Sequence, residues 1–205
     1  MPAAAPSPDL PLRWQTPAIW AEHVLRDPPA LLNDHAHLEK KAALNALDLL
    51  NRWPDPRPPE NWVQAMTAIA RDEVEHLAVV TRLLARRGGR LTRTHRNAYA
   101  SALRELVRTG EGPNELMDRL MVSAVIEARS CERFRILAEH CPDRELAGLY
   151  RGLYASEAGH YRVFLGLARE LPDAASVGRR WDGVLDAEAR IIAAQPRGPG
   201  MHSGL

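Results

Sequence analysis

Asp72-Glu73-Val74-Glu75-His76 and Ser156-Glu157-Ala158-Gly159-His160 are two short stretches that share the pattern Glu-x-x-His and decide the fold of this 205-residue chain. Each lies inside a long segment whose apolar residues recur every three or four positions, which predicts an amphipathic helix. Residues three apart share one face of a helix, so the Glu and the His of each stretch can point to one place. Random placement of the chain's glutamates and histidines gives fewer than one such pair, so a single match is weak and the two need further support.

A lone glutamate precedes each stretch by about one helix. Glu39 lies 34 residues before Glu73, and Glu127 lies 30 residues before Glu157. A single glutamate on an apolar helix face is usually at the edge of that face, with its charge in water. Four at corresponding positions indicate a shared role, because a buried carboxylate costs several kcal/mol unless it is paired or binds a metal.

The rest of the sequence divides into helices and breaks. Long helices are predicted over residues 30–52, 60–87, 114–140, 144–171 and 174–194, and short ones over 16–26 and 99–107. Prolines and glycines separate them, and about 25 residues connect the second long helix to the third. No segment alternates with period two, so no sheet is expected. The pattern predicts an all-α four-helix bundle with a long crossover between its second and third helices, plus a short N-terminal helix and a C-terminal fifth helix.

Length and composition fit one soluble domain. Hydrophobic residues make up 45%, charged residues 26%, and the net charge of +1 excludes a polybasic nucleic-acid-coating protein but not a local basic patch. We predict a flexible leader over residues 1–11, one domain over 12–194 and a disordered tail over 195–205, which is rich in Gly and Pro. No signal peptide and no apolar run of ~20 residues occurs, so a cytoplasmic location without membrane contact is expected.

The order Glu, Glu-x-x-His, Glu, Glu-x-x-His on successive helices is the ligand pattern of ferritin-like di-iron and di-manganese carboxylate proteins. The candidate metal ligands are therefore Glu39, Glu73, His76, Glu127, Glu157 and His160. The charge of the four carboxylates is balanced by two divalent ions. Such an oxygen-rich set suits iron or manganese better than a structural zinc. Six ligands for two metals leave positions open for dioxygen or substrate.

Four neighbouring residues are candidates for supporting the ligands: Asp72, Glu75, His35 and Cys131. Ligating histidines commonly donate their second ring N–H to a carboxylate, and Asp72 could reach His160 in this way. The alternative for the acidic residues is an exposed helix charge, and for Cys131 a packed core thiol. Cys131 and Cys141 would lie about 15 Å apart if they shared a helix, too far for a disulfide, so both are expected to be free.

The sequence around these residues resembles a known family. The matching segments are 37–43, 72–77, 126–134 and 156–161. Together they resemble the bacterial tRNA 2-methylthio-N6-isopentenyladenosine hydroxylases (MiaE-type), over about residues 12–192. The Glu and His set alone is specific only to the ferritin-like superfamily. The block Glu127-Ala128-Arg129-Ser130-Cys131-Glu132-Arg133-Phe134 narrows the resemblance to this family.

The resemblance implies a non-haem di-iron monooxygenase, with the six candidate ligands holding two iron ions. Its substrate would be the isopentenyl group of a modified adenosine next to the tRNA anticodon, hydroxylated with dioxygen and external electrons. A reductase or ferredoxin would be the electron-donating partner, and a monomer is favoured. Two alternatives stay open: a ferritin-like iron oxidase or storage protein without an organic substrate, and a rubrerythrin-like peroxidase. The second usually carries a Cys-rich site that two isolated cysteines cannot make.

An arginine-rich segment follows the second long helix and is the candidate surface for tRNA. Its residues are Arg82, Arg86, Arg87, Arg90, Arg93, His95 and Arg96. Such charge suits phosphates, but cations also suit a solvated helix C-terminus. If this surface receives the modified base, these residues should surround an opening that leads to the metals.

Overall fold

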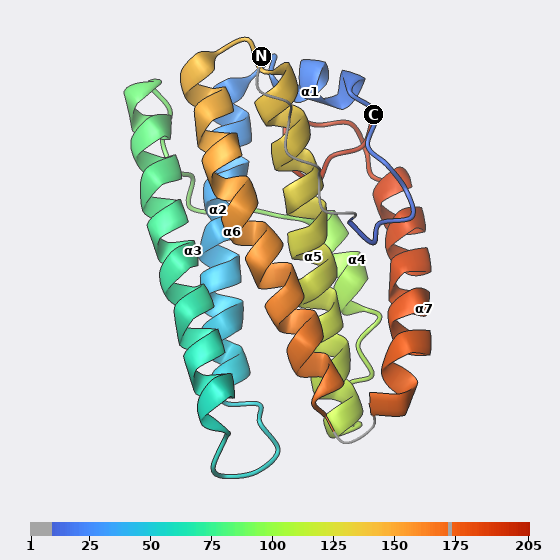
Figure 1. The fold of residues 1–205 in the computed structure, drawn as a ribbon. Coiled ribbons are helices and arrows are strands. Elements are labelled where there is room, and N and C mark those ends of the chain that lie inside the picture. The colour runs from blue at the N-terminus through green and yellow to red at the C-terminus, as the bar shows by residue number, and fades with distance from the viewer. Residues whose placement is uncertain (1–9, 172–173) are drawn as a thin grey trace, which may run out of the picture.

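The computed structural model describes residues 10–171 and 174–205 (Figure 1). Its helices are α1 (Ile19–Val24), α2 (Pro28–Leu50), α3 (Glu60–Arg86), α4 (Ala98–Arg104), α5 (Pro113–His140), α6 (Arg144–Arg169) and α7 (Ala174–Ala193). No β-strand forms in these two ranges. None of the helices within them combines the length and the hydropathy that a membrane-spanning segment needs.

The bundle consists of two helical hairpins, α2 with α3 and α5 with α6, which pack most extensively within each pair. The segment between α3 and α5 crosses the bundle and carries α4, and α7 covers the outer side of α5 (Figure 1). The predicted ferritin-like four-helix bundle with a long 2–3 crossover, a short N-terminal helix and a fifth C-terminal helix is confirmed.

Local sequence explains where the helices begin and end. Asp27 accepts a hydrogen bond from the amide of Ala30 at 3.0 Å, with two prolines in the first turn, so α2 begins at Pro28. The prediction placed this start at residue 30 because it treated both prolines as part of the break. Gly88 takes a φ of 75°, and the amide of Gly89 bonds the carbonyl of Leu84 at 3.0 Å, which ends α3 as expected.

The apolar core has two parts, one toward each end of the bundle. On α3, residues 62–70 belong to one part and residues 80–84 to the other. On α6, residues 146–153 and 164–168 divide in the same way. Both Glu-x-x-His stretches fall in the gap, so the two apolar clusters hold the polar centre between them and keep bulk water away from it.

The structure corrects two expectations about the outer residues. The spacing of apolar residues over 30–52 predicts that Leu47 lies on the inner face of the helix, but its side chain is 46% exposed. The tail over 195–205 was expected to be disordered, but it folds back on the bundle: the amide of Met201 bonds Asp34 at 2.7 Å, and Trp20 Nε1 bonds Ser203 at 3.2 Å. Met201 is fully buried. The predicted leader lies largely outside the described residues.

Candidate metal centre

The six predicted ligands gather in the middle of the bundle, contributed by α2, α3, α5 and α6. They form two overlapping sets whose ligand atoms lie within 4.8 Å of one another. The first set is Glu39, Glu73, His76 and Glu157, and the second is Glu73, Glu127, Glu157 and His160. Glu73 and Glu157 belong to both sets, so the arrangement offers two adjacent cation positions with two carboxylates in common.

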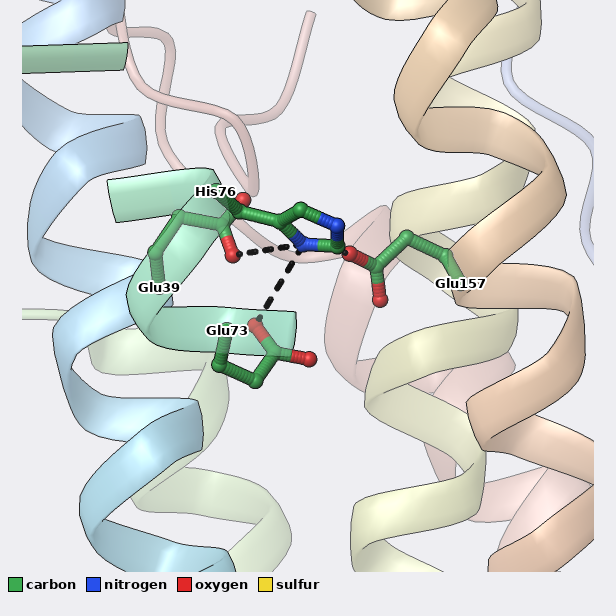
Figure 2. Close-up of side chains that lie close together, drawn as sticks. All are labelled: Glu39, Glu73, His76 and Glu157. Carbon is green, nitrogen blue, oxygen red and sulfur yellow. Dashed lines mark ion pairs between the residues drawn. The ribbon is translucent and has the colours of Figure 1, made fainter. Parts of the chain in front are cut away.

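Each histidine points its Nδ1 atom at carboxylates from its own helix and from at least one other helix. His76 Nδ1 lies 3.1 Å from Glu157 Oε1, 3.6 Å from Glu39 Oε2 and 3.9 Å from Glu73 Oε2 (Figure 2). His160 Nδ1 lies 2.8 Å from Glu73 Oε1 and 3.4 Å from Glu157 Oε2. The two imidazole centroids are 6.1 Å apart. The centre therefore has an approximate twofold arrangement, as the repeated motif predicts.

The pKa values follow from burial and from this crowding. Burial raises the pKa of Glu127 well above its usual value, and the charges of Glu157 and Glu73 raise it further. Burial alone would lower the pKa of His76, but Glu157 and Glu39 outweigh it and raise the pKa to about 10. His160 behaves alike, with Glu157 and Glu73 as its partners and a pKa of about 10. The carboxylates thus require positive charge among them.

Several buried ligand atoms have no hydrogen-bond partner among the residues that the structure describes. They are Glu73 Oε1, His76 Nδ1, both carboxylate oxygens of Glu157, and His160 Nδ1. His160 Nδ1 and Glu73 Oε1 are close but not aligned for a hydrogen bond with each other. Buried polar atoms without partners are rare in native proteins. Their lone pairs converge on shared positions, which fits cation binding by a carboxylate and imidazole donor set.

Three of the four predicted supporting residues lie beside the ligands or in the core. Asp72 Oδ2 is 3.5 Å from His160 Nε2, and fully buried His35 contacts Glu39 Oε1 closely through Nε2. Cys131 is a buried free thiol whose Sγ lies 3.8 Å from the carbonyl of Tyr154, so it packs in the core. Glu75 is exposed and does not join the cluster.

A cavity of about 90 Å³ connects the cluster to the surface between α2, α4 and α5. Four of the carboxylates line its inner wall: Glu39, Glu73, Glu127 and Glu157. Apolar residues that include Leu38, Ala42, Val122, Ile126 and Phe134 form much of the rest. A buried water needs only ~10–15 Å³ of such volume, so the cavity has room for a group of several heavy atoms.

Cations mark the outer end of this cavity, but they are not those that the sequence analysis selected. The lining includes exposed Arg104 and half-buried Lys41 and Arg119. None of the seven predicted tRNA-contacting residues lines it. Arg87 instead bonds Asp143 and Glu145, and His95 bonds Asp34 at 2.7 Å. The expectation that this surface surrounds the opening to the metals is therefore wrong.

The sequence held a weak signal for the correct opening. Arg119 and Ser123 lie eight and four residues before Glu127, so they share its helix face, whereas Lys41, two residues after Glu39, gives no such signal. Asn45 Nδ2 donates to Ser123 Oγ at 2.9 Å across the cavity wall. Arg104 could not be found in this way, because its place depends on how the crossover packs.

Comparison with known proteins supports one family across the chain. Residues 6–203 match the family described as tRNA-(MS2IO6A)-hydroxylase (MiaE). The chain is 42% identical to a tRNA 2-(methylsulfanyl)-N(6)-isopentenyladenosine(37) hydroxylase of Pseudomonas putida, covering 93% of this chain and 90% of the relative. A protein of the same name from Salmonella typhimurium is 30% identical, with 95% and 88% covered.

The fold is also similar to that of a solved structure, protein 43 with aldehyde deformylating oxygenase activity from Synechococcus. The TM-score is 0.86 at 33% identity, with 94% of this chain and 96% of that chain covered. An oxygenase therefore shares this arrangement of helices.

Proposed function

The chain belongs to the MiaE family of tRNA hydroxylases, and we propose that its six clustered Glu and His side chains hold two iron ions for dioxygen-dependent hydroxylation of a modified tRNA adenosine. The observation that carries this proposal is the pair of overlapping ligand sets beside an apolar cavity. The substrate named for the relatives is 2-(methylsulfanyl)-N(6)-isopentenyladenosine at tRNA position 37. We assign the same nucleoside to this chain.

In the proposed reaction, one atom of dioxygen enters a C–H bond of the isopentenyl group and becomes a hydroxyl. The other oxygen atom is reduced to water by two electrons and two protons, which come from outside the substrate. A reductase or a ferredoxin supplies the electrons. Iron, when bound, supplies the activation of dioxygen, which protein side chains cannot perform alone. One chain contains all six ligands and the residues that line the cavity, so the proposed site needs no residue from a second copy.

Different side chains would hold the ions, orient the ligands and bind the substrate. Glu39 and His76 would serve one ion, Glu127 and His160 the other, with Glu73 and Glu157 common to both. Asp72 lies where it orients the His160 ring, and His35 where it orients the Glu39 carboxylate. The apolar lining accepts the isopentenyl chain and excludes water around the C–H bond that reacts.

The alternative of an iron-handling protein without an organic substrate is not favoured. Such a protein has no use for an apolar cavity that ends at the carboxylates, and the relatives are named as tRNA hydroxylases. The rubrerythrin-like alternative requires a Cys-rich site, but the chain has two cysteines, of which Cys131 is buried in the core.

Deletion of the gene tests the proposed reaction directly. We expect the hydroxylated nucleoside to disappear from total tRNA, and its non-hydroxylated precursor to accumulate, because no oxygen is inserted. Mass spectrometry of digested tRNA measures both nucleosides. The wild-type gene on a plasmid should restore hydroxylation. An unchanged nucleoside profile after deletion would show that this chain does not catalyse the reaction in the cell.

We further propose that the anticodon-loop phosphates dock on Lys41, Arg104 and Arg119 at the cavity mouth. Lys41 and Arg104 have no carboxylate partner in the described part of the chain, whereas Arg119 bonds Glu115 at 2.8 Å. Burial lowers the pKa of Lys41, and the charge of Arg104 lowers it further, so two uncompensated cations lie near each other. Phosphates relieve this repulsion, and the modified base then enters the cavity out of its stack.

Arg104→Ala is expected to weaken binding of a modified anticodon stem-loop and to make the slope of log K against log salt shallower by about 1, as for one lost phosphate contact. Arg86→Ala is the matched control, because Arg86 is also exposed but bonds Glu145, and neither residue lines the cavity. Fluorescence anisotropy at several salt concentrations gives both slopes. If only Arg86→Ala reduced the slope, the result would show that the phosphates dock at the end of α3 and not at the cavity mouth.

A further inference from the structure

His202 belongs to the C-terminal segment and lies in the wall of the cavity. It is 5% exposed, and its ring packs against Tyr99 with 4.5 Å between the centroids. The neighbouring amide of Met201 is fixed by Asp34 on α2, so the segment has a defined position there. A buried histidine in a substrate cavity, outside the ligand cluster, needs an explanation.

The hydrogen bonds of Asn97 determine which nitrogen of His202 carries the proton. Asn97 caps α4, and its Oδ1 accepts from the amide of Ala100 at 3.0 Å. Its Nδ2 group therefore faces His202 Nδ1, at 3.1 Å. An amide nitrogen only donates, so Nδ1 accepts with its lone pair. Burial lowers the pKa of His202 to about 3, which keeps the ring neutral, and the proton is on Nε2.

His202 Nε2 has no hydrogen-bond partner among the described residues. Leaving a buried donor unsatisfied costs about 1–3 kcal/mol, so native proteins satisfy such groups with a ligand or with water. Asn97 occupies the Nδ1 side of the ring, Tyr99 packs against the ring, and His202 is one of the residues that line the cavity. A group that binds in the cavity is therefore the candidate acceptor for this buried N–H donor.

We propose that His202 donates a hydrogen bond from Nε2 to a ring nitrogen of the modified adenine and is a specificity-determining residue. This inference rests on the proposed function. The isopentenyl chain has no acceptor, and the phosphates remain outside at the cations. The purine is the part of the substrate that both enters the cavity and carries good acceptors, its ring nitrogens. Asn97 is the positioning residue that holds His202 in the donating tautomer.

Substitutions at His202 and Asn97 separate this role from simple packing. In the iron-loaded enzyme, His202→Phe should lower kcat/KM for a modified anticodon stem-loop by about tenfold, the value of one hydrogen bond. His202→Gln restores a donor and should recover part of the loss. Asn97→Asp keeps an oxygen that caps α4 but turns the donor to Nδ1 into an acceptor. It should therefore move the proton to Nδ1 and produce a loss similar to that of His202→Phe.

Stem-loops that carry 1-deaza, 3-deaza or 7-deaza versions of the modified adenosine identify the acceptor. The analogue that lacks the right nitrogen should bind the wild-type enzyme about tenfold more weakly, and His202→Phe should bind it as well as it binds the normal stem-loop. Equilibrium binding measures this without turnover. Ser203→Ala is the matched control, because it removes a contact of the same segment to Trp20 and leaves the cavity lining unchanged.

Two outcomes overturn the inference. In the first, His202→Phe or Asn97→Asp with two irons bound keeps the wild-type kcat/KM, so that Nε2 donates only to water. In the second, every deaza analogue loses the same factor in wild type and in His202→Phe, so that the purine is not the acceptor. If His202→Phe does not fold, Asn97→Asp decides. If the wild-type enzyme hydroxylates no tRNA, the proposed function fails instead.

Discussion

Glu127→Ala is expected to remove iron and hydroxylation together, with at least a 100-fold loss of activity, while the protein stays helical. Replacing groups that merely support a metal ligand costs 10–100-fold, so loss of a ligand should cost more. Glu127 is buried beside Glu157 and Glu73, and both raise its pKa by repulsion. Its removal therefore relieves like charge in the metal-free protein and leaves the fold intact.

Three measurements together identify Glu127 as a ligand. Iron analysis should fall from two ions per chain in the wild type to one or fewer, and circular dichroism should be unchanged. Iron should raise the unfolding temperature of the wild type, because ions that bind only the folded state stabilise it, and this rise should shrink in the variant. Two tightly bound irons in Glu127→Ala would remove this residue from the ligand set.

Glu75→Ala is the matched control for that experiment. It deletes the same side chain only two residues from Glu73, but Glu75 is exposed and lies outside both ligand sets. The control should keep both irons and full activity. A loss of iron in Glu75→Ala would mean that removing an acidic side chain near the site disturbs it even when that side chain is no ligand. The loss of iron in Glu127→Ala would then not identify Glu127 as a ligand.

The ligand cluster could be predicted because its signal is local and repeated. A Glu-x-x-His pair fixes its own geometry on a helix, and each lone glutamate falls on a stripe with apolar residues at spacings of three and four. The side chains of Glu39, Glu73, Glu127 and Glu157 therefore had to meet if the helices formed a bundle. Prolines and glycines between the helices limited the possible connections to hairpins and one crossover.

What escaped prediction depends on contacts between distant segments. The C-terminal segment has the composition of a disordered tail, yet it is fixed by Asp34 and Trp20, more than 160 residues earlier in the chain. Arg104 reaches the cavity because the crossover packs α4 against α5 and α7, where α4 lines the cavity together with α2 and α5. The number of arginines close together in sequence favoured the end of α3 as the tRNA surface. That number, however, does not determine where a cavity opens.

The surroundings of helix α5 also escaped prediction, because this helix is buried on nearly all sides. A prediction from hydrophobic periodicity assumes that one face of a helix lies in water. In this fold, α6 covers one side of α5, and α7 and α1 pack against other parts of it. Arg129, Glu132 and Arg133 are therefore buried, at 0%, 1% and 0% exposure. These charged side chains link parts of the protein in its interior. Removing one of their partners should therefore strongly lower the stability of the fold.

Glu188→Ala on α7 is expected to destabilise the protein by about 3–5 kcal/mol, the cost of breaking a buried ion pair from one side. Both carboxylate oxygens of Glu188 accept from Arg129, at 2.8 and 2.9 Å, and Oε1 also accepts from Tyr99 at 3.0 Å. Without Glu188, Arg129 and the adjacent Arg133 share only Glu132 as a buried counter-charge among the residues that the structure describes. For a chain of this size, the unfolding temperature should fall by about 6–20 °C.

Asp186→Ala on the same helix is the control, because Asp186 is exposed and its ion-pair partner in the described part of the chain is Arg13 at the surface. Its effect should stay within about 0.5 kcal/mol. Thermal and urea unfolding measure both variants. Glu188→Ala should still bind two irons at temperatures where it is folded, since Glu188 touches no ligand. A destabilisation below 1 kcal/mol would mean that water replaces the carboxylate at Arg129, and that apolar packing and the Arg180–Asp118 ion pair hold α7 on α5.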